Sequence, residues 1–187
     1  MVEIISKLLT FFVFNKNLKR KLRDKIKTFI FGFKVITKAK KIGKNFVCEG
    51  YSIASKTTTI GNNVRINSTK MRGFGEIKIG NYVQMGENIL IISENHNYDH
   101  GQQIPYDRSM ILKDVEIGDF AWIGSNVTIL PGAKIGEGAI IQAGSVVRGK
   151  IEACAIAGGN PAKVFKYRDI EHFNNLKEKG CFLKYYE

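Results

Sequence analysis

The sequence contains few of the residues from which disulfide frameworks and metal sites are built. Its three cysteines, Cys48, Cys154 and Cys181, lie far apart and show neither paired nor metal-type spacing. This pattern fits a reduced, cytosolic protein in which the cysteines are packing residues. Of the three histidines only His96 and His100 are close in sequence, so a zinc site with three histidine ligands lacks its third ligand.

The sequence also lacks an apolar run long enough to cross a membrane. Residues 2–14 are strongly apolar, but Glu3 and Lys7 interrupt them, and the unbroken run from Leu8 is far below the ~20 residues that a spanning helix needs. No small-residue cleavage site follows, which disfavours a secretory signal. We therefore expect neither a transmembrane helix nor a cleaved leader.

A six-residue repeat dominates the middle of the chain. Within residues 117–147 an aliphatic residue recurs at every sixth position: Ile117, Ile123, Ile129, Ile135, Ile141 and Val147. Three such units can form one triangular turn of a parallel β-helix, with these residues stacked in an inward column. Gly, Asn and Asp just after each aliphatic residue suit the corners, because they tolerate positive φ. The repeat begins imperfectly at Ile42 and predicts a β-helix over residues 42–166.

The repeat has one large interruption before it fades. Residues 93–114 (SENHNYDHGQQIPYDRSMILKD) lose the period and gain His, Tyr, Pro and charge. Functional residues of a regular solenoid usually lie in a loop that is inserted between its coils. Residues 157–164 (AGGNPAKV) terminate the coil, and residues 167–179 are expected to form a short helix within a C-terminal segment, residues 167–187, that packs back on the last coil.

Acidic residues are scarce in the first part of the chain. Residues 1–44 contain 13 Lys and Arg against Glu3 and Asp24, a net charge of +11, whereas residues 45–187 contain 16 basic and 15 acidic residues, a net charge of +1. The apolar residues here recur at helical spacing: Leu18, Leu22, Ile26, Phe29, Ile30 and Phe33. Residues 1–41 are therefore predicted to be a segment built on a basic amphipathic helix.

Two interpretations of this helix stay open. It can lie in the headgroup region of an anionic membrane, so that residues 1–34 make peripheral contact with the inner face of the cytoplasmic membrane. Alternatively, it packs on the open end of the β-helix or on a neighbouring subunit, with a solvated basic face. Nucleic acid is a weaker candidate partner, because no recognised binding motif or aromatic stacking platform accompanies the charge.

The sequence resembles the left-handed β-helix acyltransferases with hexapeptide repeats. The resemblance covers about residues 42–166 and rests on the His-bearing loop, the coil WIGSNVTILPGAKIGEGAIIQAGSVV and the terminator AGGNPAKV. It implies an all-β fold, a left-handed parallel β-helix between the N-terminal amphipathic helical segment and the short C-terminal helix. It also implies a homotrimer that holds acetyl-CoA between adjacent subunits and transfers the acyl group directly to an acceptor. No metal is expected.

The resemblance implies that His96 is the general base. An acceptor hydroxyl is a poor nucleophile at neutral pH, and an imidazole can take its proton as the oxygen attacks the thioester carbonyl. The second ring nitrogen then needs a partner, for which Glu94, Asp99 and a backbone carbonyl are candidates. His100 is the competing base, and His172 is expected to be a surface or packing residue.

The remaining site residues are also implied by the resemblance. Ser125 offers its backbone amide or hydroxyl to the oxyanion of the tetrahedral intermediate, or is simply a corner serine. Trp122 lines the site near the pantetheine arm or the acceptor, or is an interface aromatic. Ala143 and Gly144 let the pantetheine arm run along the coil, or suit a tight corner. Basic side chains are expected to meet the phosphates of CoA: Arg148, Lys163 and Lys166, with Lys150 and Arg168 nearby.

We expect an acetyl-CoA-dependent O-acetyltransferase of a sugar in surface polysaccharide biosynthesis, because the chain is most similar to capsular and lipopolysaccharide O-acetyltransferases and its basic first 34 residues suit a lipid-linked acceptor. A xenobiotic O-acetyltransferase and a sugar N-acetyltransferase are the alternatives within the family. A zinc hydratase on the same type of β-helix, a non-catalytic β-helix and an acyl-cysteine route are disfavoured.

Overall fold

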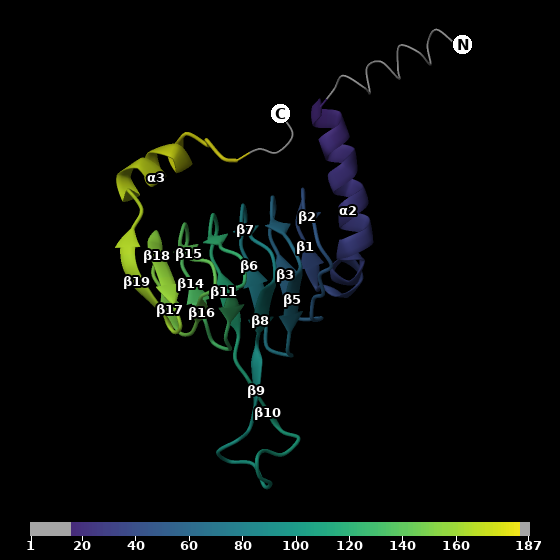
Figure 1. Cartoon of the computed structure of the whole chain (residues 1–187), viewed down its shortest axis with the longest axis vertical. Helices are drawn as coiled ribbons and strands as arrows, with labels where there is room; N and C mark the ends of the chain where they lie inside the picture. The colour runs from purple at the N-terminus through teal and green to yellow at the C-terminus, as the bar shows by residue number, and fades with distance from the viewer. Residues whose placement is uncertain (1–15, 184–187) are drawn as a thin grey trace, which may run out of the picture.

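The computed structural model describes residues 16–183, and most of them form a parallel β-helix (Figure 1). Three sheets make its faces, here named A, B and C in the order in which each coil visits them. Face A consists of β1 (Lys41–Ile42), β3 (Thr58–Ile60), β6 (Ile77–Ile79), β11 (Val115–Ile117), β14 (Lys134–Ile135) and β17 (Lys150–Ile151). Face B consists of β2 (Val47–Cys48), β4 (Arg65–Ile66), β7 (Gln84–Met85), β12 (Trp122–Ile123), β15 (Ile140–Ile141), β18 (Ala155–Gly159) and β19 (Ala162–Tyr167). Face C consists of β5 (Thr69–Arg72), β8 (Ile89–Ile92), β13 (Thr128–Ile129) and β16 (Val146–Val147).

The inward column that the repeat predicts is confirmed. Neighbouring coils pair in parallel with the aliphatic positions in register, so that Ile117 lies between Ile79 and Ile135. Its repeat equivalents from Ile117 to Val147 are all at most 3% exposed. Burial of each such side chain is worth about 1.5–3 kcal/mol, so this column contributes substantially to the stability of the coil.

The glycines that follow the inward residues act differently from the expectation. Gly118 and Gly124 are absent from the residues with positive φ, which fall later in each corner, at Phe120 (59°) and Asn126 (57°). A Cβ on Gly124 would lie 2.6 Å from the backbone nitrogen of Ala143 on the next coil. Because coils stack at the ~4.8 Å spacing of strands, these positions need glycine for close approach rather than for positive φ.

Two helices flank the coil, as predicted, at its opposite ends (Figure 1). Helix α2 (Lys16–Lys38) lies beside the first coil, and α3 (Ile170–Glu178) follows β19. The ring of Phe173 on α3 packs edge-on against Phe120 at 6.1 Å. Within the described residues, no helix has the length and apolar character needed to cross a bilayer. The apolar residues 2–14 lie outside the described part of the chain.

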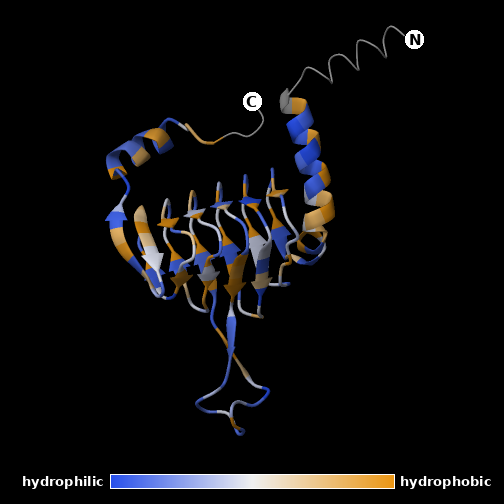
Figure 2. Ribbon diagram, in the orientation of Figure 1, coloured by the Kyte–Doolittle hydropathy of each residue, from blue (hydrophilic) through white to orange (hydrophobic). Residues whose placement is uncertain are grey.

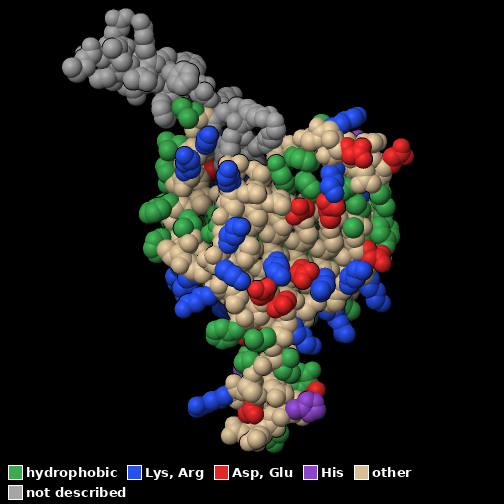
Figure 3. Space-filling model, turned by 180° about the vertical axis from the view of Figure 1, so that it is seen from behind, with side chains coloured by type: hydrophobic (Ala, Val, Ile, Leu, Met, Phe, Trp, Pro, Cys, Tyr) green, Lys and Arg blue, Asp and Glu red, His purple; other side chains and the backbone are tan. Residues whose placement is uncertain are grey.

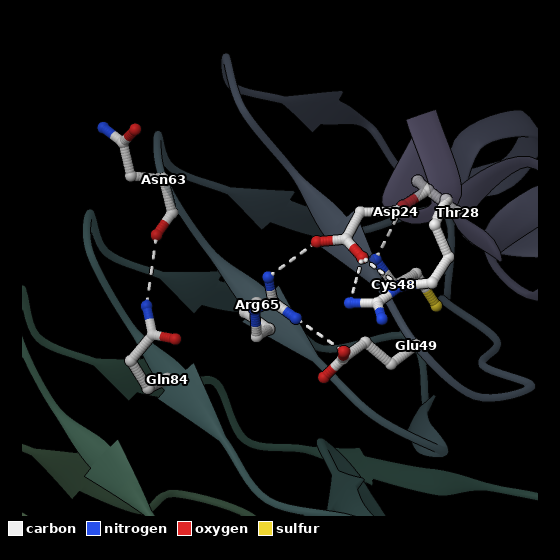
Figure 4. Close-up of polar contacts among 8 residues, drawn as sticks. Asp24, Thr28, Cys48, Glu49, Asn63, Arg65 and Gln84 are labelled. Atoms are coloured by element: carbon white, nitrogen blue, oxygen red, sulfur yellow. Dashed lines mark hydrogen bonds and ion pairs between the residues drawn. The ribbon is translucent and has the colours of Figure 1, made fainter. Parts of the chain in front are cut away.

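Helix α2 packs on the open end of the coil through a side that carries both polar and apolar residues. The Thr28 hydroxyl accepts a hydrogen bond of 2.9 Å from the backbone N–H of Cys48 (Figure 4). Gly32 lies against the Cys48 side chain. Val35 is fully buried in the core. The structure thus shows the helix packed on the open end of the coil, while the predicted apolar residues from Leu22 to Phe33 remain exposed instead of facing the coil.

Candidate active site

A hairpin replaces one corner of the coil at the interruption of the repeat. Its strands, β9 (Glu94–His96) and β10 (Met110–Leu112), are antiparallel, with His96 opposite Met110. The hairpin leaves the coil between β8 on face C and β11 on face A and projects away from it (Figure 1). We call this edge of the coil corner CA. His96 is therefore presented outside the coil by a two-stranded stalk.

The Asp107 carboxylate holds the end of the hairpin together. It accepts hydrogen bonds of 2.8 Å from the backbone N–H groups of Gln102 and Ser109, and a third from the Ser109 hydroxyl. The Ser109 hydroxyl, followed by the two amides, lowers the pKa of Asp107, because each donor favours the charged carboxylate. The loop that carries His96 and His100 thus has a defined shape although it extends into solvent.

The His96 ring is exposed and stacks on Tyr106, with 3.8 Å between centroids and 13° between planes. Among residues 16–183 no hydrogen bond of the His96 ring is observed. Glu94, one candidate for orienting the ring, instead accepts a hydrogen bond of 2.9 Å from the backbone N–H of Phe74. Stacking on Tyr106 is therefore what orients the imidazole within this chain.

Ser125 lies on corner BC, the edge between faces B and C. Its hydroxyl accepts a hydrogen bond of 3.2 Å from the backbone N–H of Glu87 on the preceding coil. The equivalent acceptor one coil further on would be the side chain of Ala143, which has no oxygen. Among the described residues, the Ser125 N–H accordingly has no observed hydrogen-bond acceptor. A backbone amide without an acceptor is a donor that can meet an oxyanion.

Corner BC stays open beyond Ser125. Ala143 and Gly144 are both exposed, and Gly144 donates a hydrogen bond of 2.8 Å from its backbone N–H to the Ser125 carbonyl. Gly144 has a φ of +73°, and a Cβ built on it would meet no atom within 4 Å. The structure thus brings Ser125, Ala143 and Gly144 together along an unobstructed edge.

The predicted basic residues divide between two places. Lys163 and Lys166 are exposed on β19, and Lys163 pairs with Gly158, which packs against Gln142 near corner BC. Arg148 is exposed in the tight turn between β16 and β17, on corner CA. Lys150 follows Arg148 on face A, so it also lies away from corner BC. Across the described residues, no group of three or more His, Cys, Asp and Glu side chains is arranged to hold a metal ion.

Trp122 lines an apolar cleft that the sequence did not reveal. It is 55% exposed on face B and borders a cavity of about 460 Å³ between the coil and the C-terminal segment. The other aromatic side chains of this cavity are Tyr82, Phe120, Phe173 and Phe182. A sequence signal did exist, because Tyr82 and Phe120 occupy the positive-φ corner position that Asn45 and Asn63 hold in earlier coils.

The hairpin and the coil residues are not joined within one chain. No hydrogen bond or ring contact among residues 16–183 links His96 to Ser125 or Trp122. His100 donates from its backbone N–H to the Asn97 side chain at 3.1 Å and is exposed on the same loop, and His172 is exposed on α3. Within one chain, His96 is therefore carried away from corner CA, whereas Ser125 lies on corner BC.

Comparison with known proteins bears on this geometry. Residues 110–149 match the model of the bacterial transferase hexapeptide (six repeats) family. The chain is 34% identical over 126 residues to an Escherichia coli (strain K12) protein assigned as the lipopolysaccharide biosynthesis O-acetyl transferase WbbJ, and the match spans 63% of each protein.

Two solved structures are similar over most of their length. The hexapeptide-repeat acetyltransferase VCA0836 from Vibrio cholerae is 30% identical with a TM-score of 0.56, over 68% of this chain and 70% of that one. A galactoside acetyltransferase in complex with coenzyme A is 25% identical with a TM-score of 0.66, over 84% of this chain and 86% of that one.

Proposed function

Because the chain belongs to the hexapeptide-repeat acetyltransferases, we propose that it transfers an acetyl group from acetyl-CoA to a hydroxyl of a sugar. The observation that carries this proposal is corner BC, where the Ser125 N–H has no acceptor among residues 16–183 and the edge past Gly144 is open. The coenzyme A complex of the similar galactoside acetyltransferase supports acetyl-CoA as the donor.

His96 takes the proton of the acceptor hydroxyl as its oxygen attacks the thioester carbonyl. The carbonyl oxygen gains negative charge, and the Ser125 N–H donates a hydrogen bond to it. When the tetrahedral intermediate collapses, the carbon–sulfur bond breaks and the proton held by His96 passes to the departing thiolate. The products are the acetyl ester and free CoA, and the Lys163 and Lys166 ammonium groups neutralise the CoA phosphates.

The site is proposed to form between copies in a homotrimer. Within one chain the hairpin with His96 leaves corner CA, whereas Ser125 lies on corner BC. A cyclic assembly with its coils side by side would bring corner CA of each copy to corner BC of the next. Arg148 on corner CA would then lie at the same boundary as Lys163.

The acceptor is proposed to be a sugar of a surface polysaccharide, acetylated in the cytoplasm at the inner face of the membrane. The similarity to WbbJ, which is assigned to lipopolysaccharide biosynthesis, supports this class of acceptor. The basic N-terminal segment, residues 1–34, supports contact with an anionic membrane. Both features favour a lipid-linked glycan as the molecule that is modified.

Thiol release from acetyl-CoA tests the reaction. The purified chain is incubated with sugars, nucleotide sugars, oligosaccharide repeats and antibiotics, and His96→Ala and His100→Ala are measured in parallel. We expect acceptor-dependent release that falls by about 10²-fold or more in His96→Ala and stays near the parent rate in His100→Ala. The opposite ranking would move the base to His100, and release with antibiotics alone would overturn the polysaccharide acceptor.

Subunit mixing tests where the site forms. His96→Ala and Ala143→Ser are each expected to be inactive, because one lacks the base and the other blocks the Ser125 amide. If base and amide come from different copies, co-expression of the two variants will restore activity in mixed trimers. Mixtures that stay as inactive as either variant, although mass measurement shows mixed trimers, would place both groups in one copy.

A further inference from the structure

Helix α2 carries an exposed apolar stripe on the side facing away from the coil. Its members are Leu22, Ile26, Phe29, Ile30, Phe33 and Ile36, and their exposed fractions run from 46% to 68%. At 3.6 residues per turn they fall on one side of the helix, over about 21 Å of its length. Hydrophobic side chains line the corresponding left edge of the molecule in Figure 3, and orange segments mark them along α2 in Figure 2. We name this surface the α2 stripe.

The opposite side of α2 is fixed to the coil by polar contacts. Asp24 is 1% exposed, and its carboxylate accepts a hydrogen bond of 3.0 Å from the Arg65 guanidinium on β4. The Phe31 carbonyl accepts another of 3.0 Å from the backbone N–H of Ser52. A helix that was merely stabilising the coil would bury its apolar side. Here the inward side combines Asp24 and Thr28 with the apolar Phe31 and Val35, and the larger apolar stripe is displayed on the outside.

Cations border the α2 stripe on both sides. By helical spacing, Arg23 and Lys34 follow its one edge and Lys25 its other edge. Residues 16–38 contain nine Lys and Arg against Asp24 alone, a net charge of +8. A second α2 packed on the stripe would bring the same charge, so like charges would repel along its length. A partner surface with an apolar interior and an anionic outer layer would match both the apolar stripe and the cations that border it.

We propose that the α2 stripe is the surface by which the protein lies on an anionic lipid bilayer. The apolar side chains enter the boundary between headgroups and acyl chains, and the flanking Lys and Arg meet the lipid phosphates. This proposal rests on the membrane location proposed for the enzyme, but lipid binding and acetyl transfer are measured separately.

The position of α2 sets how the coil meets the bilayer. Because α2 covers the first coil and the α2 stripe faces outward, the coil axis runs away from the membrane (Figure 1). In a trimer with parallel coils, all three α2 stripes would lie in one plane and bind together, which multiplies the weak affinity of each. Ser125, on the fourth coil, would stand about 20–30 Å above the lipid, from ~4.8 Å per coil plus the thickness of a helix. That height suits a glycan extended from a lipid anchor.

Sedimentation with sucrose-loaded vesicles tests the surface. We expect the full chain to bind vesicles of 30% phosphatidylglycerol in phosphatidylcholine, to bind pure phosphatidylcholine much more weakly, and to lose binding as salt rises. In Ile26→Ser/Ile30→Ser the partition coefficient should fall by about tenfold or more, from the apolar area removed. The matched control, Ile104→Ser/Ile170→Ser, changes two exposed isoleucines on the hairpin and on α3 and should bind as the parent does.

Brominated lipids locate the contact. The parent has a single tryptophan, Trp122, which lies on face B of the fourth coil, so its fluorescence should be unaffected by vesicles whose acyl chains carry bromine. Phe29→Trp adds a second tryptophan on the α2 stripe, and its emission should be quenched. Quenching of Trp122 without quenching at position 29 would contradict the proposed surface.

Three results would overturn the proposal. In the first, the parent fails to bind anionic vesicles. In the second, Ile26→Ser/Ile30→Ser binds as the parent does, which would assign binding to another segment such as residues 1–15. In the third, that variant dissociates into smaller species by light scattering, which would make the α2 stripe a contact between copies. Thiol release with a soluble acceptor should be unchanged in the stripe variant, and His96→Ala should still bind vesicles, so failure of either proposal is seen separately.

Discussion

The Asp24 carboxylate accepts a 3.0 Å hydrogen bond from the Arg65 guanidinium, and this ion pair fixes helix α2 to face B of the coil across 41 residues of sequence. Arg65 also pairs with Glu49 at 2.6 Å, so one guanidinium bridges the helix and the first coil (Figure 4). The pair lies on the inward side of α2, together with the apolar contacts of Phe31 and Val35. The exposed residues of the α2 stripe lie on the other side.

Replacement of Asp24 should loosen α2. Asp24→Asn removes the charge of a side chain that is 1% exposed and weakens its bond to Arg65, so we expect the free energy of unfolding to fall by about 2 kcal/mol. Urea denaturation followed by circular dichroism measures the loss. Glu76→Gln is the control, because Glu76 pairs with Lys40 and Lys78 at the exposed surface and should contribute little. Equal losses in both variants would show that the Asp24 contact is no stronger than a surface pair.

Only one of the three cysteines should react quickly in the folded protein. Cys48 and Cys154 are buried, and burial raises the pKa of both thiols, which keeps them protonated at pH 8. Cys181 is exposed. Titration with a chromogenic disulfide at pH 8 should therefore show about one fast equivalent, abolished by Cys181→Ser, and all three thiols after unfolding. Fast reaction of the Cys181→Ser variant would indicate that a buried cysteine becomes open to solvent.

Tyr106 should set the orientation of the proposed base. Its ring stacks on His96 at 3.8 Å, so Tyr106→Ala frees the imidazole to rotate and should lower kcat by about tenfold while KM for acetyl-CoA stays near the parent value. Tyr98→Ala is the control, because Tyr98 is 64% exposed on the same loop. Equal effects of the two substitutions would point to the loop as a whole rather than to the stacked pair.

The coil could be predicted from the sequence because its physics is local and periodic. An aliphatic residue at every sixth position of a triangular coil faces the interior, and Ile123 and Ile129 are accordingly fully buried. The role of the following glycine was mistaken, since conformational freedom and close packing both select glycine. Only the distance from Gly124 to Ala143 on the next coil separates the two reasons.

Features that depend on distant pairs could not be predicted. The sequence shows that α2 is amphipathic, but the side that faces the coil makes contacts with residues far away in sequence, such as Asp24 with Arg65, and no local pattern records them. The same limit applies to the proposed site. Its residues could be named by resemblance, whereas the absence of an acceptor for the Ser125 N–H follows from the stacking of Ala143 beside it.

A side chain at Gly144 should obstruct the donor and leave the fold intact. Gly144 and Gly149 have φ of +73° and +72°, and a Cβ on either meets no atom within 4 Å, yet Gly144 lies on corner BC and Gly149 on corner CA. Asn tolerates this backbone conformation. Gly144→Asn should therefore raise KM for acetyl-CoA by about tenfold, and Gly149→Asn should raise it less, with similar melting temperatures for both. A larger effect at Gly149 would place the pantetheine arm on the other corner.

An oxygen at position 143 should disable the proposed oxyanion donor. The Glu87 N–H donates to the Ser125 hydroxyl one coil on, and Ala143→Ser would offer the Ser125 N–H the same kind of acceptor. Loss of one oxyanion donor typically costs about 10²–10³ in kcat, so we expect a fall of this order in thiol release, with unchanged thermal stability. Ala143→Cys is the matched control, because it has almost the same shape but only a weakly accepting sulfur. Ser125→Ala, which keeps the amide and removes the hydroxyl, should retain most of the activity. If Ser125→Ala is inactive while Ala143→Ser is active, the hydroxyl rather than the amide meets the oxyanion.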